Sequence, residues 1–452
     1  MTSERDVWVF LPGEVAPTLC GRFEHWRSPA GQSLGSFVYG RRYLESRFAL
    51  ALDPVALPLR EQLFETAGAA QGVFGVFADA GPDDWGRYVI DRQHGVQSSP
   101  IGYLRLSQDD RVGNLCFSSS VDEPVHLPDP VSCALLDEAW AVVAGLEEGR
   151  PIPSELAHRI RANTAMGGAR PKLTVADGRA QWLAKFPSRR DDPRWSQARV
   201  EAAMLDLARV CKIDAARARL HVVDERGLPE PRISCGDVLL VERFDRTLAP
   251  SGAAGPQGSS PVPTAWLRDA YVSARTVMLS DVHGPHASYG GSYARLSRQL
   301  QRWSGHVAAD RLELYRRMVF NCCISNTDDH DRNHGLLASE DGRAFRLAPA
   351  FDMVPRLHAT ARRYQAMNIG DHGAESTAEN LLSAAAAFQI EHVRAQEIID
   401  EVQTLVIENW RNCMSNRGLD ELAIELLSPC FAPIPQSFDE IDTPIRQRPG
   451  MR

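Results

Sequence analysis

Short apolar runs that are rich in β-branched and aromatic residues dominate the first part of the chain. Residues 6–11 (DVWVFL) predict a strand, and residues 37–44 (FVYGRRYL) predict another strand of the same small sheet. Residues 101–120 hold two β-like runs around a polar turn, a pattern that predicts a hairpin. A proline-rich stretch follows at 124–130 (PVHLPDP). We therefore expect a mixed, mostly β unit over residues 1–130, with a boundary at its end.

The chain then alternates between helical and strand-like patterns. Residues 131–149 predict a helix that ends before Pro151. In residues 171–186 (PKLTVADGRAQWLAKF), two strand-like runs flank Asp177-Gly178, which is a strong hairpin signal. One helical pattern and two strand-like runs follow, at residues 197–211, 218–223 and 237–244. These patterns predict a second β-rich unit over residues 131–246.

Beyond that point the pattern is helical. Residues 247–263 (TLAPSGAAGPQGSSPVP) lack periodicity, and their composition predicts a flexible insert. Amphipathic helical spacing then covers residues 292–303, 310–324 and 377–427. The last residues, 433–452, carry four prolines, and we expect them to be disordered. A β-rich half followed by a helical lobe over residues 264–432 indicates a two-lobed α+β fold.

Composition narrows the class of protein. Apolar residues make up 44% and charged residues 24% of the 452 residues, as in ordinary globular proteins. The net charge of -8 argues against nucleic-acid binding by the chain as a whole. Nine scattered cysteines without a C-x-x-C pair favour buried thiols in a reducing compartment. No apolar run of eighteen residues and no leader-like N-terminus occurs, so we expect a cytoplasmic protein.

The densest polar segment is residues 325–335 (SNTDDHDRNHG), which follow an apolar helical run. Within it, Asp328 and Asn333 have the D-x-x-x-x-N spacing of a kinase catalytic loop. Such a loop needs a carboxylate to accept the proton of a substrate hydroxyl and an amide oxygen to hold Mg²⁺. Because burying so many polar groups is costly, we expect this segment at the surface or in a cleft.

Two other charged residues lie within apolar runs. Asp352 ends an apolar run in LAPAFDMVP, where a lone carboxylate suits a second ligand for a hard cation. Lys185 lies in the apolar run WLAKFP, where phosphate oxygens could partner its ammonium group. Just upstream, in MGGARPK, Gly167 and Gly168 permit close approach of the backbone to phosphates, and Lys172 could add charge.

Other interpretations of these residues stay open. A helix-capping polar loop would account for residues 325–335 on their own. His330 and His334, four apart among carboxylates, also fit a transition-metal site of a nuclease or hydrolase. That reading leaves Lys185 unexplained, although a lysine at a strand end can also extend its ammonium group to solvent. Asp352 could equally lie in a surface turn before a proline.

Five motifs in order, MGGARPK, WLAKFP, VERFDR, NTDDHDRNHG and APAFDMVP, resemble the HipA family. The founding members of that family are toxins of toxin–antitoxin pairs with a protein-kinase-like fold. Residues 82–89, 107–117 (SQDDRVGNLCF) and 289–299 (YGGSYARLSRQ) extend the resemblance over most of the chain. It implies a bilobal α+β fold with a β-rich N-terminal lobe, an extra N-terminal subdomain and a mostly helical C-terminal lobe.

The resemblance also implies roles for individual residues, with ATP and Mg²⁺ as cofactors. Asp328 would be the catalytic base, and His330 would support its loop. Asn333 and Asp352 would bind Mg²⁺, and Lys185 would contact the α/β-phosphates. The remaining contacts to the nucleotide would come from Lys172, from the phosphate-side loop of Gly167, Gly168 and Ala169, and from Glu242 and Phe244 at the hinge beside the adenine.

The function implied by the resemblance is that of a serine/threonine protein kinase acting as a toxin. Its substrate would be a protein such as an aminoacyl-tRNA synthetase or another translation factor. A small helix-turn-helix antitoxin would be its partner, through which the complex reaches operator DNA. The alternative from another class is a catalytically silent module that serves an antitoxin as co-repressor. The family's self-phosphorylated serine before the glycine loop is replaced here by Ala165, beside Thr164.

Overall fold

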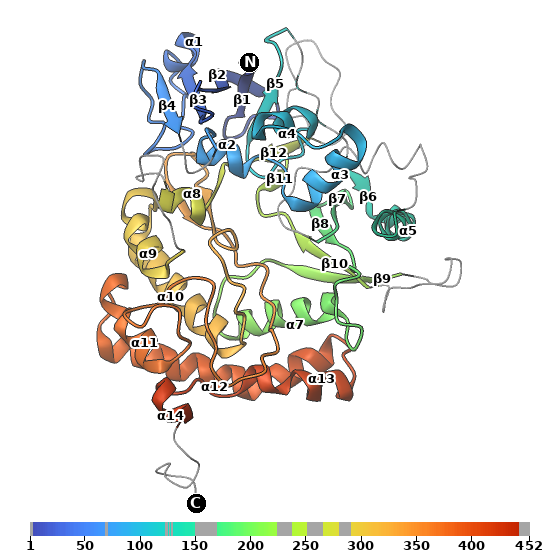
Figure 1. The fold of residues 1–452 in the computed structure, drawn as a ribbon, viewed down its shortest axis with the longest axis vertical. Helices are drawn as coiled ribbons and strands as arrows, with labels where there is room; N and C mark the ends of the chain where they lie inside the picture. Colours follow the sequence, from blue (N-terminus) through green and yellow to red (C-terminus); the bar gives the residue numbers. More distant parts are fainter. Residues whose placement is uncertain are drawn as a thin grey trace, which may run out of the picture. The chain divides into compact units, whose positions relative to one another are not determined.

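The computed structural model describes residues 3–67, 71–122, 125, 127, 130–149, 170–223, 237–250, 265–279 and 291–442. It divides the chain into two compact units (Figure 1). The strand-rich unit comprises Met1–Asp191, Arg219–Tyr289 and Gly335–Phe345. The helical unit comprises Asp192–Ala218, Gly290–His334 and Arg346–Arg452. The chain crosses between the two units several times, so neither unit is a continuous segment.

A five-stranded antiparallel sheet opens the strand-rich unit, in the order β4-β3-β2-β1-β5. Its strands are β1 (Ser3–Phe10), β2 (Pro17–Arg27), β3 (Ser33–Tyr39), β4 (Phe64–Ala67) and β5 (Leu115–Ser118). The predicted strands at 6–11 and 37–44 are confirmed in β1 and β3, although the second gives way to the short helix α1 (Arg41–Leu44). Phenylalanine rings of β2, β3 and α2 (Gly75–Asp79) pack together at centroid distances of 5.1–5.4 Å.

The predicted hairpin over residues 101–120 is wrong in its first half. Residues Pro100–Leu106 form helix α4, which follows helix α3 (Asp84–His94), and only the second apolar run forms a strand, β5. Pro100 occupies the first turn of α4, where its missing N–H costs nothing. Ile101 and Leu104 are both buried, and their spacing of three places them on one face of a helix.

A second sheet lies further along the same unit, in the order β6-β7-β8-β10-β9. Its strands are β6 (Val131–Ser132), β7 (Lys172–Ala176), β8 (Gln181–Lys185), β9 (Ala218–Val222) and β10 (Asp237–Glu242). The β7–β8 hairpin turns at Asp177-Gly178, as predicted. Gly178 has φ +81°, and the Asp177 carboxylate accepts hydrogen bonds from the backbone N–H groups of Arg179 and Ala180, both at 3.0 Å.

One face of this second sheet packs against helix α5 (Leu136–Glu147). Alternate residues of β7, β8 and β10, among them Leu173, Ala184 and Leu240, belong to this buried apolar cluster together with Trp140 of α5. The predicted helix over residues 131–149 is therefore confirmed from residue 136 onward. The register pairs Lys185 with both Lys172 and Leu239, and the strand alternation places these residues on the other face of the sheet.

Short strands complete the strand-rich unit, together with helix α8 (Ala274–Leu279). Strand β11 (Arg246–Leu248) pairs with β12 (Trp266–Arg268), and β13 (Tyr271–Ser273), β14 (Gly335–Ala338) and β15 (Phe345–Leu347) form a three-stranded sheet. The insert expected at 247–263 thus begins within a strand, and its residues 251–263 lie outside the described part of the chain.

The helical unit is built around the long helix α12 (His392–Asn416), which packs against α7 (Gln197–Val210) and α10 (Val307–Cys323). In Figure 1, α12 runs alongside the green helix α7. Serine side chains cap the first turns of α7 and of α9 (Tyr293–Trp303), as their N-terminal positions favour. The remaining helices are α11 (Ala378–Ser383), α13 (Glu421–Leu427) and α14 (Phe438–Asp442). The helical segments predicted at 197–211, 292–303, 310–324 and 377–427 are confirmed.

The disorder expected from residue 433 onward is wrong for the residues that the structure describes there. Residues 433–442 include α14, and the ring of Phe438 packs against that of Tyr364 with centroids 5.3 Å apart. Burial of the Phe438 ring favours an ordered segment here despite the nearby prolines. Residues 443–452 lie outside the described part.

Two further features concern membrane-spanning helices and the state of the cysteines. Among the described residues, no helix is both long enough and apolar enough to cross a bilayer. The eight cysteines in the described ranges are free thiols, and seven of them are buried. Burial raises the pKa of Cys322 to about 12, so this thiol stays protonated near neutral pH.

Candidate functional site

The polar segment after α10 alternates between exposed and buried side chains. The Asp328 side chain is 53% exposed, whereas that of Asp329 is 3% exposed. His330 is exposed, while Asn333 and His334 are buried. We expected this segment at the surface or in a cleft, and within it only Asp328, His330 and Arg332 are exposed. Burial is tolerated because the buried members bond to one another and to the neighbouring helices.

A single carboxylate oxygen organises the buried members. Asp329 Oδ2 accepts hydrogen bonds from Tyr293 Oη, from Asn321 Nδ2 at 2.8 Å and from His334 Nε2 at 2.8 Å. The Tyr293 and His334 rings meet edge to face, with centroids 5.5 Å apart. Burial raises the pKa of Tyr293 well above its usual value, and the Asp329 carboxylate adds to this rise, so the phenol remains a hydrogen-bond donor.

Of the residues with predicted chemical roles in this loop, Asp328 and His330 are exposed and Asn333 is buried. Asn333 Nδ2 donates to the backbone oxygen of Asp328 at 3.3 Å, and its backbone N–H donates to the oxygen of His330 at 2.9 Å. The His330 ring accepts from the N–H of Arg332 through Nδ1 at 3.3 Å, which stabilises the turn. With the Asn333 amide nitrogen facing its own loop, the amide oxygen is the atom that can ligate a cation.

Asp352 lies in a backbone turn of unusual conformation. It is half-buried and has φ +59°, a left-handed value that is uncommon for residues other than glycine. Just before it, Ala350 is fixed by two backbone hydrogen bonds, to Asp214 at 2.7 Å and from Ala216 at 2.9 Å. Such conformations cluster at functional sites, so the turn agrees with the predicted role of Asp352 as a cation ligand.

The segment after Asp352 contacts the loop that carries Asp328. The backbone N–H of Arg356 donates to the oxygen of Ser325 at 3.1 Å, and its guanidinium group donates to Asp328 Oδ2. Thr327 Oγ1 and His358 Nε2 are 3.0 Å apart. The structure therefore brings together two predicted elements of the site, the Asp328 loop and the segment that begins at Asp352.

The donor set of these two elements fits a hard cation. An amide oxygen and a carboxylate are ligands that Mg²⁺ accepts, while water and phosphate oxygens complete its octahedron in kinase sites. The alternative transition-metal site is not favoured, because His330 is exposed whereas His334 is buried against Asp329. Within the described ranges, no group of three or more His, Cys, Asp and Glu side chains is arranged to hold a metal ion.

The two lysines predicted to bind nucleotide lie opposite each other in the strand-rich unit, on β7 and β8. Lys172 Nζ donates to Asp83 Oδ2 at 2.9 Å, and both side chains are buried. Burial raises the pKa of Asp83 even though the ammonium group opposes this rise. Because the Lys172 charge is already neutralised, the structure favours a role in joining α3 to β7 over the predicted phosphate contact. Lys185 is half-buried at the end of β8, and its contact with phosphates stays a prediction.

The two residues predicted at the hinge, Glu242 and Phe244, lie at the end of β10 and just after it. Glu242 pairs with Trp182 across β10 and β8, so its side chain and that of Lys185 lie on opposite faces of the sheet. Phe244 is half-buried, with its ring centroid 6.2 Å from that of Tyr271. Only a backbone contact from Glu242 is therefore compatible with a nucleotide on the face of Lys185. The predicted phosphate-side loop, Gly167, Gly168 and Ala169, lies outside the described residues, as do Thr164 and Ala165.

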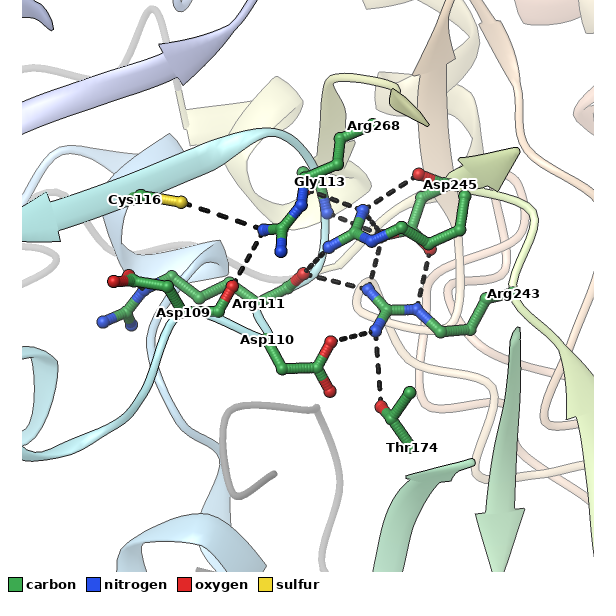
Figure 2. A network of polar contacts seen from close by, with 10 residues as sticks. Asp109, Asp110, Arg111, Gly113, Cys116, Thr174, Arg243, Asp245 and Arg268 are labelled. Atoms are coloured by element: carbon green, nitrogen blue, oxygen red, sulfur yellow. Dashed lines mark hydrogen bonds and ion pairs between the residues drawn. The ribbon is translucent and has the colours of Figure 1, made fainter. Parts of the chain in front are cut away.

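Arg243, Asp245 and Arg246 of VERFDR belong to a buried ionic network that the sequence did not predict (Figure 2). Arg243 donates to Asp245 at 2.9 and 3.0 Å and also to Asp110. Arg246 shares Asp245 Oδ2 at 2.9 Å, and the N–H of Gly113 donates to the same oxygen at 2.8 Å. Burial alone would raise the pKa of Asp245, but the two guanidinium groups outweigh burial and hold it well below the usual range.

This network joins the two motifs that resembled the HipA family in different parts of the chain. SQDDRVG supplies Asp110 and Gly113 near the first sheet, and VERFDR supplies Arg243 and Asp245 at the end of β10. Gly113 has φ +77°, and an added Cβ would lie 3.1 Å from the Tyr271 nitrogen, so glycine is required at this turn. Arg243, Asp245 and Arg246 of the motif therefore have a structural role. The sequence signal was the dense run of charges directly after an apolar strand.

The sequence alone also did not identify Asn321 and Tyr293 of the helical unit as partners of Asp329. Asn321 was visible as a lone amide within the apolar run LYRRMVFNCCI, where a buried polar group needs a partner. Tyr293 belongs to the motif YGGSYARLSRQ, whose residues had no predicted role. Nothing local in the sequence connects either residue to Asp329, because their bonds join segments 8 and 36 residues apart.

Comparisons with known proteins bear on the family. The family model described as HipA-like C-terminal domain matches residues 164–410, and the model described as HipA N-terminal domain matches residues 21–118. A Sinorhizobium fredii (strain NBRC 101917 / NGR234) protein, "Putative kinase Y4dM", is 30% identical over 196 residues. That match spans 42% of this chain and 41% of the relative's own length.

Solved structures bear on the fold. HipA of the Shewanella oneidensis MR-1 toxin–antitoxin system, solved with HipB and its operator DNA, matches with a TM-score of 0.62 at 16% identity. The match covers 97% of this chain and 100% of that one. A weaker match is the Helicobacter pylori proinflammatory kinase CtkA, with 10% identity and a TM-score of 0.34. That match covers 57% of this chain and 92% of CtkA. The chain has the HipA fold and, since the C-terminal family model spans more than half of it, belongs to the HipA-like kinase family.

Proposed function

We propose that this chain is an ATP- and Mg²⁺-dependent serine/threonine protein kinase that acts as the toxin of a HipA-type toxin–antitoxin system. One observation carries the proposal: an exposed carboxylate, Asp328, stands on a loop whose other end, Asn333, is hydrogen-bonded back to it at 3.3 Å. The segment that begins at Asp352 is bonded to the same loop. These contacts support the proposal, because phosphoryl transfer requires a proton acceptor near oxygen ligands for a cation.

In the proposed reaction the substrate hydroxyl oxygen forms a bond to the γ-phosphorus while the bond from that phosphorus to the ADP oxygen breaks. The hydroxyl proton passes to the Asp328 carboxylate. Asn333 and Asp352 would hold Mg²⁺, which when bound neutralises negative charge on the phosphates. Lys185 would orient the α/β-phosphates, with backbone contacts from Glu242 and the glycine loop. Most of the rate would come from this positioning.

Arg356 must leave Asp328 before the carboxylate can act. Its guanidinium group bonds the carboxylate, and the two side chains are 55% and 53% exposed. An ion pair this exposed contributes about 0–1 kcal/mol, so incoming substrate can displace it at little cost. The pair therefore does not argue against a base role for Asp328.

Likeness to the Shewanella protein supports a proposal for the binding partner. That HipA was solved with HipB and operator DNA. By extension we propose a small DNA-binding antitoxin for this chain. The substrate that we propose, a translation protein such as an aminoacyl-tRNA synthetase, is the one that the family resemblance implies. Co-purification of the full chain with the product of an adjacent helix-turn-helix gene, followed by a gel shift on their shared promoter, would test the partner.

The decisive test of activity is substitution of Asp328. The full chain is incubated with γ-³²P-ATP, Mg²⁺ and a set of purified aminoacyl-tRNA synthetases and translation factors. We expect transfer by the wild type and a fall of roughly 10²–10⁴-fold for Asp328→Asn, the contribution typical of a general base. Because the side chain is exposed, the melting temperature should not change. Equal transfer by the folded variant would refute the assignment, and a silent wild type that still binds antitoxin would support the co-repressor alternative.

A further inference from the structure

The loop that carries Asp328 and Asn333 has a buried partner directly after each of these residues. Asp329 follows Asp328, and His334 follows Asn333. The two partners bond each other, with His334 Nε2 2.8 Å from Asp329 Oδ2, and their side chains are 2% and 3% exposed. This contact, which we name the clasp, closes the base of the loop. A bond between the two following residues fixes how far apart Asp328 and Asn333 can lie.

The clasp is itself fixed to two helices. Tyr293 at the start of α9 and Asn321 in α10 both donate to the oxygen that His334 contacts. Asn321 in turn accepts from Asn326 Nδ2 at 3.0 Å, at the beginning of the loop. All of these side chains are buried, with Tyr293 and Asn321 fully so. Such a bonded, buried network holds one geometry, because a broken bond would leave a polar group without water or partner.

A second feature distinguishes the clasp from ordinary core packing. His334 Nδ1 is buried and accepts or donates no hydrogen bond within the described part of the chain. A buried histidine with one bonded nitrogen is costly, whereas an apolar residue of similar size would fill the space without that penalty. Packing alone therefore does not account for the imidazole, whereas its bond to Asp329 does.

We propose that Asp329 and His334 are positioning residues, which set the separation between the Asp328 carboxylate and the Asn333 amide oxygen. The inference rests on the proposed kinase function and deepens it. Neither residue touches substrate. They act on the reaction by placing the proton acceptor and the cation ligand, in the way that residues behind metal ligands orient those ligands.

The test compares His334→Ala with His334→Gln in the full chain. The glutamine amide can place an N–H where Nε2 now donates, whereas alanine removes it. For His334→Ala we expect kcat to fall about 10–100-fold, the range typical of lost support behind metal ligands, with an unchanged KM for the protein substrate. The Mn²⁺ concentration for half-saturation of the nucleotide complex, followed by electron paramagnetic resonance, should rise in parallel. Glutamine should restore both quantities to within roughly threefold of wild type.

Two tyrosines provide a matched control. Tyr293 and Tyr315 are both fully buried in the helical unit, and each hydroxyl donates one hydrogen bond, to Asp329 and to the backbone oxygen of Leu381 respectively. Tyr293→Phe should weaken Mn²⁺–nucleotide binding several-fold, by roughly the effect of one lost hydrogen bond. Tyr315→Phe should lower thermal stability to a similar degree and leave metal binding unchanged.

The outcomes separate the clasp from the kinase proposal. Normal Mn²⁺ binding by a folded His334→Ala protein would overturn the clasp, as would glutamine and alanine variants that are impaired equally. Equal effects of the two tyrosine variants on metal binding would also overturn it, since they would indicate a general loss of stability. A wild-type protein that binds Mn²⁺–ATP but transfers no phosphate would sink the kinase proposal, and the metal titrations would still decide on the clasp.

Discussion

The strand-rich unit and the helical unit each bury a set of polar side chains, and the two sets are satisfied differently. In the strand-rich unit, the guanidinium groups of Arg243 and Arg246 meet the carboxylates of Asp110 and Asp245. In the helical unit, one carboxylate, that of Asp329, receives bonds from a phenol, an amide and an imidazole. Full opposite charges hold two distant motifs together in the first case. In the second, the buried set lies directly beside Asp328, which remains exposed.

The difference shows what separates a structural cluster from a candidate catalytic one. Every charged member of the first network that we named is at most 6% exposed, so none can reach a ligand without disrupting the fold. In the second cluster, exposed and buried side chains alternate from Asp328 to Arg332, and Asp328 stays accessible beside the buried Asp329. Both segments are rich in charged residues, and the pattern of exposure distinguishes the two.

The largest effect on stability should come from breaking the ionic network. Arg243→Leu leaves the buried carboxylates of Asp110 and Asp245 partly uncompensated, which costs about 3–5 kcal/mol. We expect hydrogen exchange to accelerate in β5, β7 and β10, while the protection of α10 and α12 in the helical unit falls less. Arg41→Leu serves as control, because both partners of its pair with Glu61 are exposed, and such a pair contributes about 1 kcal/mol or less. Equal effects of the two variants would contradict the comparison.

Acid should weaken the strand-rich network as well. The depressed pKa of Asp245 means that its ionised form stabilises the fold at pH values above the ordinary aspartate pKa of about 3.9. This stability is lost as the pH falls through the lower, folded-state pKa, and each unit of depression corresponds to about 1.4 kcal/mol. Protection of β10, measured by exchange from pH 5 to pH 2, should therefore fall more steeply in the wild type than in Asp245→Asn. Parallel profiles would show that Asp245 is not held ionised by the arginines.

Asp352 allows a test of charge without a change of backbone. Asparagine tolerates the left-handed conformation that Asp352 adopts, so Asp352→Asn removes the carboxylate charge alone. We expect Mg²⁺-dependent ATP binding, measured by calorimetry, to weaken about tenfold or more, in line with loss of one of two protein ligands. Asp371→Asn, an exposed acid in the same unit, should bind as the wild type does. Unchanged binding by the Asp352 variant would remove it from the proposed site.

The smallest effect should come from Arg356. Its exposed pair with Asp328 must open during each proposed turnover, so Arg356→Ala should raise the rate of phosphoryl transfer by roughly two- to fivefold, the equivalent of an exposed ion pair. Added salt should raise the wild-type rate slightly and the variant's rate less, because salt screens exposed pairs. A marked loss of rate would instead assign Arg356 to substrate binding.

The sequence by itself determined most of the elements and their kind. Hydrophobic spacing located α7, α9, α10 and α12, and Asp177-Gly178 fixed the β7–β8 turn, because such periodicities and turn preferences are local. The D-x-x-x-x-N spacing also identified the loop whose exposed carboxylate the structure presents. Local rules misjudged residues 100–106, where a short apolar run fits a helix and a strand equally well.

Tertiary structure alone decided which polar residues are buried and with whom. Lys172 was expected to face phosphates and instead pairs with Asp83, 89 residues away. Arg243 pairs with Asp110, which lies 133 residues away in the sequence, and Asp329 bonds to Tyr293, 36 residues away. Hydrogen bonds and ion pairs act over a few ångströms in space, whatever the distance along the chain. Their partners therefore follow from the fold and not from any neighbouring residue.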